Sequence, residues 1–191
     1  MKYAKIVGRI RGDERMKKVI FAWHVHHDVL VEPLLESIQN RIEYIKEFKP
    51  ENEIKLRLRL LKVVKGELPK ELVEAGKQYC EVRRKFFEAY EEGQKFVEIK
   101  QKYYKAKWEI KKGKLSKEFI NTERQYYEAR RRAIEVKKKY YKARQKFIEA
   151  KERYYKAYKK HEPEILALHA KECPNCTWNG KIIFNKEGKS H

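Results

Sequence analysis

The chain has 191 residues, of which 40% are charged and 41% are hydrophobic, and its formal net charge is +20 at pH 7. The hydrophobic content is too high for a disordered chain, and the charged residues are interleaved with apolar ones instead of forming blocks. No stretch approaches the roughly 18 consecutive apolar residues of a membrane span, and the N-terminus lacks the apolar core of a signal peptide. We therefore expect no membrane partner, and a protein of the cytoplasm or of the inside of a virus-like particle.

The number of cysteines indicates the redox compartment of the protein. The three cysteines, Cys80, Cys173 and Cys176, are odd in number and sparse, which agrees with a reducing compartment and does not make a disulfide framework. The high Lys and Glu content, together with only two Met, is typical of a thermophilic source.

Residues 1 to 69 predict a small α+β domain, which begins with a β-hairpin. Apolar residues alternate from Ile6 to Ile10, a turn-like Gly12-Asp13-Glu14-Arg15 follows, and an apolar run extends from Val19 to Trp23. This order of alternation, turn and apolar run favours two paired strands.

Helices are predicted in the rest of this region. After Pro33, apolar residues recur at helical spacing as far as Phe48, and Pro50 ends that element. The stretch from Ile54 to Val64 fits the spacing of a strand and of a helix, and its Leu, Arg and Lys content favours the helix.

The region of residues 70 to 161 carries a seven-residue repeat, which is strict from Phe119 to Ala157 and has three inserted residues between Phe86 and Phe96. Each repeat has two adjacent aromatic or aliphatic residues and a small one two positions later, as in Tyr126/Tyr127/Ala129 and Tyr140/Tyr141/Ala143. A strict period of seven is typical of a helix that keeps one face toward a partner helix. A turn near 111–116 then predicts a basic antiparallel coiled-coil hairpin of two helices, each of about 40 to 45 residues.

The turn also predicts the register of the two helices. If Ile110 faces Phe119, then Tyr103 lies beside Tyr126 and Ala89 beside Tyr140. The second of these pairs sets a large side chain against a small one, as close packing requires.

One apolar column is left over, because the repeat covers a wider arc than the seam of a two-stranded coil. This column consists of Tyr127, Ile134, Tyr141, Ile148 and Tyr155. We expect it to pack on the N-terminal domain, on another copy or on a ligand. Its tyrosines are either core residues with their hydroxyls at the rim, or platforms on which nucleotide bases stack.

Most of the positive charge lies on the hairpin. Residues 77 to 161 contain 28 basic and 12 acidic side chains, a net charge of +16. Such a rod attracts polyanions, of which nucleic acid, RNA or DNA, is the commonest; the alternatives are a solvated face and an acidic protein partner. The candidate nucleic-acid-binding residues are Lys100, Lys102, Lys105, Lys107, Lys111, Lys112, Lys114, Arg130, Arg131, Arg132, Lys137, Lys138 and Lys139.

Residues 162 to 191 predict a zinc-knuckle-like tail. His169, Cys173 and Cys176 have the spacing H-x3-C-x2-C, in which two thiolates on a tight turn and a histidine one helical turn earlier can bind one structural zinc ion. The fourth ligand is His161, His191 or a histidine of the N-terminal region. An unmetallated thiol pair and a redox dithiol are the alternatives, although no thioredoxin-like βαβ pattern surrounds the pair.

A second cluster of histidines, His24, His26 and His27, follows the apolar run that ends at Trp23. On a strand, His24 and His26 point to the same face, as in metal-dependent hydrolases, and Asp28 or Glu32 could complete such a site. A hydrolase of that kind needs a larger barrel than this region can form. The other interpretations are a structural metal site shared with the tail, and partly buried histidines.

The heptads and the tail Glu172-Cys173-Pro174-Asn175-Cys176 together resemble a group of uncharacterised microbial and viral proteins. These proteins have tandem Tyr-x-Lys-Ala repeats ahead of a Cys-Pro-x-Cys tail. The resemblance spans most of the chain and implies no known activity.

The sequence predicts a mainly α protein that binds nucleic acid without catalysis. No Gly-rich phosphate loop, nucleophile elbow or paired-carboxylate motif points to an enzyme. The alternative is a structural protein that assembles through its leftover column, as a homo-oligomer or as part of a larger particle. A metal-dependent hydrolase at the N-terminal histidines is the third hypothesis.

Overall fold

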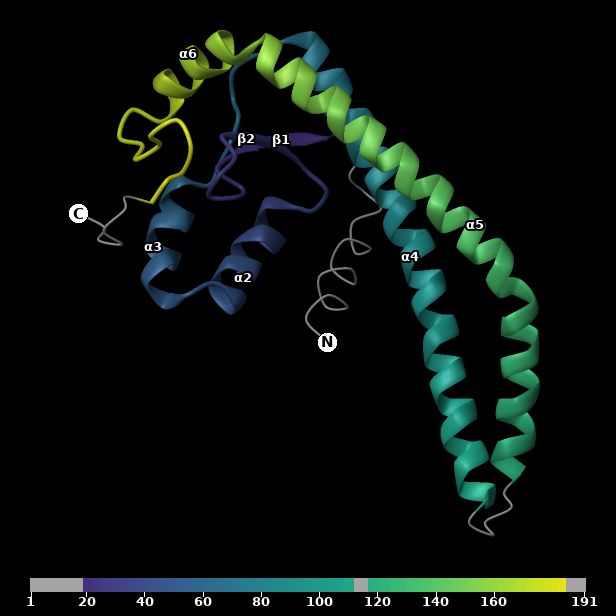
Figure 1. Ribbon diagram of the computed structural model, residues 1–191. Coiled ribbons are helices and arrows are strands. Elements are labelled where there is room, and N and C mark those ends of the chain that lie inside the picture. Colours follow the sequence, from purple (N-terminus) through teal and green to yellow (C-terminus); the bar gives the residue numbers. More distant parts are fainter. Residues whose placement is uncertain (1–18, 112–116, 185–191) are drawn as a thin grey trace. The chain divides into compact units, whose positions relative to one another are not determined.

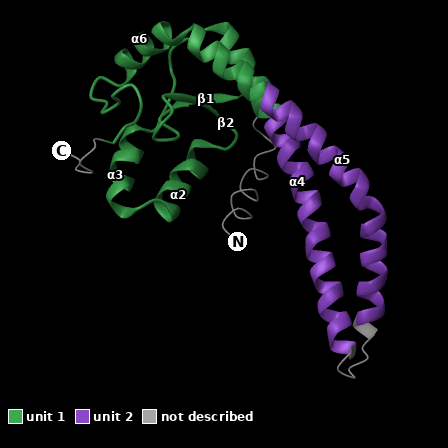
Figure 2. Ribbon diagram, in the orientation of Figure 1, with its two compact units in different colours: residues 1–81, 150–191 green, residues 82–149 purple. Residues whose placement is uncertain are grey.

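A computed structural model of the protein describes residues 19–111 and 117–184 (Figure 1). They are mainly helical, as predicted, and include a small three-stranded antiparallel sheet where a two-stranded hairpin was predicted. Among these residues, no helix combines the length and the apolarity needed to cross a bilayer. The chain divides into two compact units, residues 1–81 with 150–191 and residues 82–149 (Figure 2). The N-terminal region and the tail, predicted as separate regions, therefore belong to one unit.

The sheet of the first unit has the strand order β2-β1-β3. Strand β1 (Ile20–Trp23) pairs antiparallel with β2 (Val31–Leu34) and with β3 (Lys62–Val63). The predicted strand that ends at Trp23 is confirmed, and the hairpin it forms here is with β2. The segment Ile6–Ile10, its predicted partner, lies outside the described residues. Pro33 is compatible with β2 because that strand lies at the edge of the sheet.

Two helices follow the hairpin, as predicted. Helix α2 (Ile38–Phe48) starts after the N-cap Ser37, whose Oγ accepts a hydrogen bond of 3.1 Å from the backbone N–H of Asn40. Pro50 separates α2 from α3 (Glu51–Leu60), which confirms a helix from Ile54 to Leu60. The predicted continuation of this helix to Val64 is wrong, because Lys62 and Val63 form β3, which pairs with β1. Helix α3 also has acidic residues in its first turn and basic residues in its last turn, which complements the helix dipole.

Strand β1 packs on both faces of the sheet, because its successive side chains point to opposite sides and each set contacts a different cluster. On one face, Phe21 and Trp23 share a cluster with residues of the long helices and of helix α6 (Glu162–Glu172). Its buried members include Leu72, Tyr154, Ala157, Ile165 and Cys173. On the other face, Ala22 packs with Ile45 and Leu61. The tail therefore contributes Cys173 to the same core as the sheet.

Helices α4 (Lys70–Lys111) and α5 (Lys117–Lys160) have 42 and 44 residues, which confirms the predicted lengths. Within the second unit they run antiparallel and pack through aromatic rings. The predicted pairing of Tyr103 with Tyr126 is confirmed, since their rings stack with centroids 4.2 Å apart. The ring of Tyr140 lies against those of Phe86 and Tyr90, which flank Ala89, in agreement with the predicted register.

Candidate functional site

His24 directly follows β1 and has an unusual backbone. Its φ of 54° is the only positive φ of a non-glycine residue in the described part of the chain, and this left-handed region is uncommon for a side chain with a Cβ. The His24 backbone N–H donates a hydrogen bond of 2.9 Å to the carbonyl of Leu30, which closes the loop between β1 and β2. In this position His24 is 1% exposed, so its imidazole is buried.

The His24 side chain meets two ligand-type side chains from the C-terminal part of the first unit. Its Nε2 atom lies 2.9 Å from Nε2 of His169 on α6 and 3.1 Å from Sγ of Cys176 in the tail. All three atoms lie within 4.8 Å of one another, and no other such group of His, Cys, Asp or Glu occurs among the described residues. Ligand atoms around one zinc ion lie roughly 3 to 4 Å apart. This group could therefore hold a metal ion.

The protonation states of the two imidazoles suit a metal. The pKa of His24 is lowered to about 4, mainly by burial and further by the charges of His169 and Lys62. Burial likewise lowers the pKa of His169. Both imidazoles are thus neutral at neutral pH, the form that coordinates metals.

The two cysteines lie on one tight turn at the end of α6. The N–H of Cys173 donates to the carbonyl of His169 at 2.8 Å, and the N–H of Cys176 donates to the carbonyl of Cys173 at 3.1 Å. Burial raises the pKa of both thiols. The backbone N–H of Trp178 lies 3.4 Å from Sγ of Cys176, where it favours the thiolate. Cys173 is buried and on the same turn, but its Sγ is not one of the three clustered atoms.

His161, predicted as a metal ligand, is not brought to this group. Its ring nitrogens contact Glu164 at 3.0 Å and Glu71 at 3.1 Å. The alternative ligand His191 lies outside the described residues.

The other N-terminal histidines have different partners from His24. His26 pairs with the carboxylate of Glu32, and His27 lies 3.8 Å from Asp28. The strand alternation that was expected to align His24 with His26 ends at Trp23, because β1 ends there and the backbone of His24 turns. The geometry therefore gives no support to a hydrolase site built on both side chains.

Hydrogen bonds fix the end of α6 and the tail beside this group. The carboxylate of Glu172 accepts the indole N–H of Trp23 at 2.8 Å and the backbone N–H of Gly66 at 2.6 Å. Further along the tail, the N–H of Ile183 donates to the carbonyl of His27 at 3.0 Å. The tail is thus folded back against the loop that carries His24.

The leftover column on α5 is exposed along its whole length. The exposed fractions of Tyr127, Ile134, Tyr141, Ile148 and Tyr155 are 46%, 66%, 54%, 36% and 40%. The interpretation of these tyrosines as core residues is therefore wrong for the described chain. The preceding residue of each repeat is less exposed: Tyr126 and Tyr154 are buried, at 8% and 3%, and Ala133, Tyr140 and Phe147 are half-buried.

A row of cations accompanies this apolar column. The residues three positions after its first four members are all basic and all exposed, namely Arg130, Lys137, Arg144 and Lys151. The ammonium of Lys137 lies 5.9 Å from the ring centroid of Tyr141, and that of Lys151 lies 5.8 Å from that of Tyr155. We call these four residues the cationic row.

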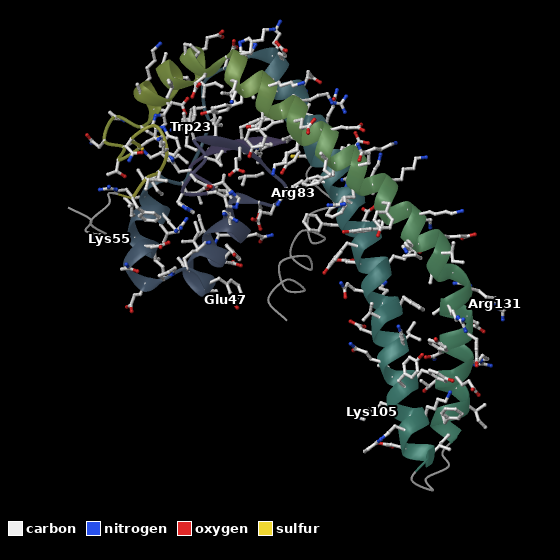
Figure 3. The ribbon with its side chains drawn as sticks, in the orientation of Figure 1. Trp23, Glu47, Lys55, Arg83, Lys105 and Arg131 are labelled. Carbon is white, nitrogen blue, oxygen red and sulfur yellow. The ribbon has the colours of Figure 1, made fainter. Side chains whose placement is uncertain are left out.

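The predicted nucleic-acid-binding cations are exposed wherever their side chains are described. This holds for Lys100, Lys102, Lys105, Lys107, Arg130, Arg131, Arg132, Lys137, Lys138 and Lys139. Figure 3 shows Lys105 on α4 and Arg131 on α5 pointing outward from the helix pair. Lys111 is the last residue of α4, and Lys112 and Lys114 lie outside the described residues. Arg144 and Lys151 were not predicted, although their seven-residue spacing from Lys137 could have identified them.

The fold and these sites define a mainly helical protein with a long helical hairpin and a compact unit that carries a candidate metal group. Comparison with protein-family models, with curated proteins and with solved structures gives no match.

Proposed function

We propose that the protein binds nucleic acid, without catalysis, through the apolar column and the cationic row of α5. The observation that carries this proposal is that exposed tyrosines and exposed cations follow the same seven-residue period on one helix. Tyrosine faces stack on bases, and Lys and Arg pair with backbone phosphates. Because stacking requires unpaired bases, single-stranded RNA or DNA is the favoured ligand.

The charge of the second unit supports this proposal. Residues 82–149 contain 22 basic and 10 acidic side chains, a net charge of +12. At a rise of about 1.5 Å per residue, the cationic row places one charge about every 10.5 Å along α5. Within this unit, a phosphate backbone laid along α5 could meet Arg130, Lys137 and Arg144 in succession, with bases turned toward Tyr127 and Tyr141.

A pair of charge variants tests the cationic row. Lys137→Gln/Arg144→Gln removes two members of the row. The control Lys146→Gln/Arg153→Gln also removes two exposed cations. These follow Tyr141 and Ile148 by five residues, which places them about 140° around the helix from the column. Binding of a labelled single-stranded 20-mer is measured by anisotropy at several salt concentrations. We expect the row variant to lose the greater affinity and to reduce the salt slope by about 1 to 2. Equal losses in both variants would contradict a specific role of the row.

The column is tested by Tyr141→Ala and Tyr141→Phe. The alanine variant removes the stacking surface, which corresponds to a loss of about 5- to 150-fold in affinity. The phenylalanine variant keeps the ring and should bind like the wild-type protein. Similar affinities of all three proteins would exclude base stacking at this position.

The alternative to nucleic-acid binding is self-assembly through the apolar column, and one observation favours it. Ile134 is 66% exposed, and an aliphatic side chain in a heptad column is typical of a helix seam. A second copy would, however, bring the same cationic row to the interface, where like charges repel. A defined oligomer that persists at high salt, measured by light scattering, would favour assembly; a monomer would contradict it.

We propose in addition that the His/Cys group of the first unit holds structural zinc. Neutral imidazole and thiolate together are the donors that zinc prefers. A reducing compartment, the cytoplasm or the inside of a virus-like particle, would keep the thiols available for it.

A further inference from the structure

We infer that His24, His169, Cys173 and Cys176 bind one zinc ion, which fastens the end of β1 to the C-terminal tail. This inference rests on the proposed zinc and does not depend on nucleic-acid binding. It assigns a ligand set and a role that the spacing of the tail motif leaves open.

The placement of His24 is the first argument. Its Nε2 is within 3.1 Å of both Nε2 of His169 and Sγ of Cys176, so three ligand atoms converge on one point. The backbone of His24 has a φ of 54°, and strained backbone of this kind clusters at functional sites.

The crowding of polar atoms around Nε2 of His24 is the second argument. A ring nitrogen has either one N–H or one lone pair, yet this atom lies 2.9 Å from Nε2 of His169 and 3.1 Å from Sγ of Cys176. In a neutral pair of imidazoles joined through their Nε2 atoms, only one proton can lie between the rings. A metal ion bound there would accept both Nε2 lone pairs and a lone pair of the sulfur. Coordination would then satisfy all three buried polar atoms, whereas one hydrogen bond satisfies only two.

Cys173 is the residue that would supply the fourth ligand. It is 4% exposed, a free thiol, and the start of the turn that ends at Cys176. Two cysteines separated by two residues on a tight turn commonly bind one zinc ion together. His161, in contrast, is engaged by the carboxylates of Glu71 and Glu164.

The surroundings of the group fit a structural centre. The ring of Trp23 lies 5.2 Å from that of His169, and the ring of Trp178 lies 5.7 Å from that of His24, between centroids. The two imidazoles are also little exposed, at 1% for His24 and 7% for His169, as suits a structural site. His24 is separated by 145 residues from His169 and by 152 from Cys176, so one ion would close a very long loop and stabilise the fold strongly.

The first experiment measures metal in the full-length protein. Zinc is determined by mass spectrometry after purification without added metal, and cobalt(II) is then exchanged into the site. We expect one zinc per chain, and a cobalt spectrum with the thiolate charge-transfer and intense visible bands of tetrahedral coordination. Removal of the metal with a chelator should lower the thermal midpoint of the wild-type protein.

The second experiment assigns the ligands by competition with a chromophoric zinc chelator. His24→Ala, Cys173→Ser and Cys176→Ser should each weaken zinc binding more than about 100-fold, beyond the usual effect of an outer-shell group. The matched controls His26→Ala and His161→Ala should bind zinc like the wild-type protein. Circular dichroism of each variant with excess cobalt shows whether the variant still folds. If a variant does not fold, the zinc content and the cobalt spectrum of the wild-type protein still test the inference.

The outcomes separate the two proposals. A wild-type protein that binds neither zinc nor cobalt would overturn both the zinc proposal and this inference. Zinc that survives His24→Ala and is lost in His161→Ala would overturn the ligand set and leave structural zinc in place. Loss of zinc in the three ligand variants, with both controls unchanged, is the result we expect.

Discussion

The rings of Tyr103 and Tyr126 stack with their centroids 4.2 Å apart and their planes 2° from parallel. They come from opposite helices of the hairpin, and they are 3% and 8% exposed. This contact connects the two helices near the turn and fixes their register there. The stability of the second unit should therefore depend on it.

We expect Tyr103→Ala to destabilise the protein by about 2 to 4 kcal/mol, because it removes a buried ring and leaves a cavity beside Tyr126. The matched control is Tyr141→Ala, which removes a ring that is 54% exposed and should change stability by less than about 1 kcal/mol. Chemical denaturation followed by circular dichroism measures both. Equal losses would mean that the stack does not define the hairpin core.

The two glycines inside α4 should respond in opposite ways to alanine. A Cβ on Gly76 would lie 2.4 Å from Cζ of Phe21, a buried ring, so Gly76→Ala should destabilise by about 1 to 3 kcal/mol. A Cβ on Gly93 would meet only Val136, at 4.0 Å. Gly93→Ala should therefore stabilise by about 0.5 to 1 kcal/mol, through helix propensity. Thermal unfolding measures both, and a stabilised Gly76→Ala would contradict the close packing of α4 on β1.

Much of the helical part of this fold could be predicted from local patterns. The seven-residue repeat predicted the lengths of α4 and α5, and the position of the turn predicted the contact of Tyr103 with Tyr126. Strand β2 was missed because its edge position tolerates Pro33, which in the sequence resembles the start of a helix.

The candidate metal group was predictable only in part. The spacing of His169, Cys173 and Cys176 indicated a site, and the histidines after Trp23 were recognised as one option for completing it. The selection of His24 over His161 depends on a backbone turn and on tertiary contacts across about 150 residues, which no local pattern contains. The column beginning at Tyr127 was identified by its period, but its exposure required the structure.

His161 should make the stability of the first unit depend on pH. Hydrogen bonds to Glu164 and Glu71 raise its pKa above the ordinary 6.5, so its contribution is fully present below about pH 6.5 and is lost as the pH rises through the raised value. The pKa of Glu71 is lowered from 4.5 by hydrogen bonds from Lys160 and His161. The contribution of Glu71 to stability is therefore lost only as the pH falls through its lowered pKa, which lies below 4.5.

We therefore expect His161→Gln to lower the thermal midpoint most between about pH 5 and 6.5, and little near pH 9. The control His26→Gln, which leaves the contacts of His161 intact, should not show this profile. A midpoint difference for His161→Gln that is constant from about pH 5 to 9 would contradict the ion pairs. An NMR titration of the His161 ring checks the direction of the pKa shift independently.

The measurement that most directly tests the central claim is the affinity of the full-length protein for a labelled single-stranded 20-mer, as RNA and as DNA, between about 50 and 300 mM salt. Binding that weakens linearly on a log–log scale with rising salt, and that weakens further in Lys137→Gln/Arg144→Gln than in Lys146→Gln/Arg153→Gln, is the predicted result. The absence of binding to single-stranded or duplex nucleic acid at about 50 mM salt would contradict the account.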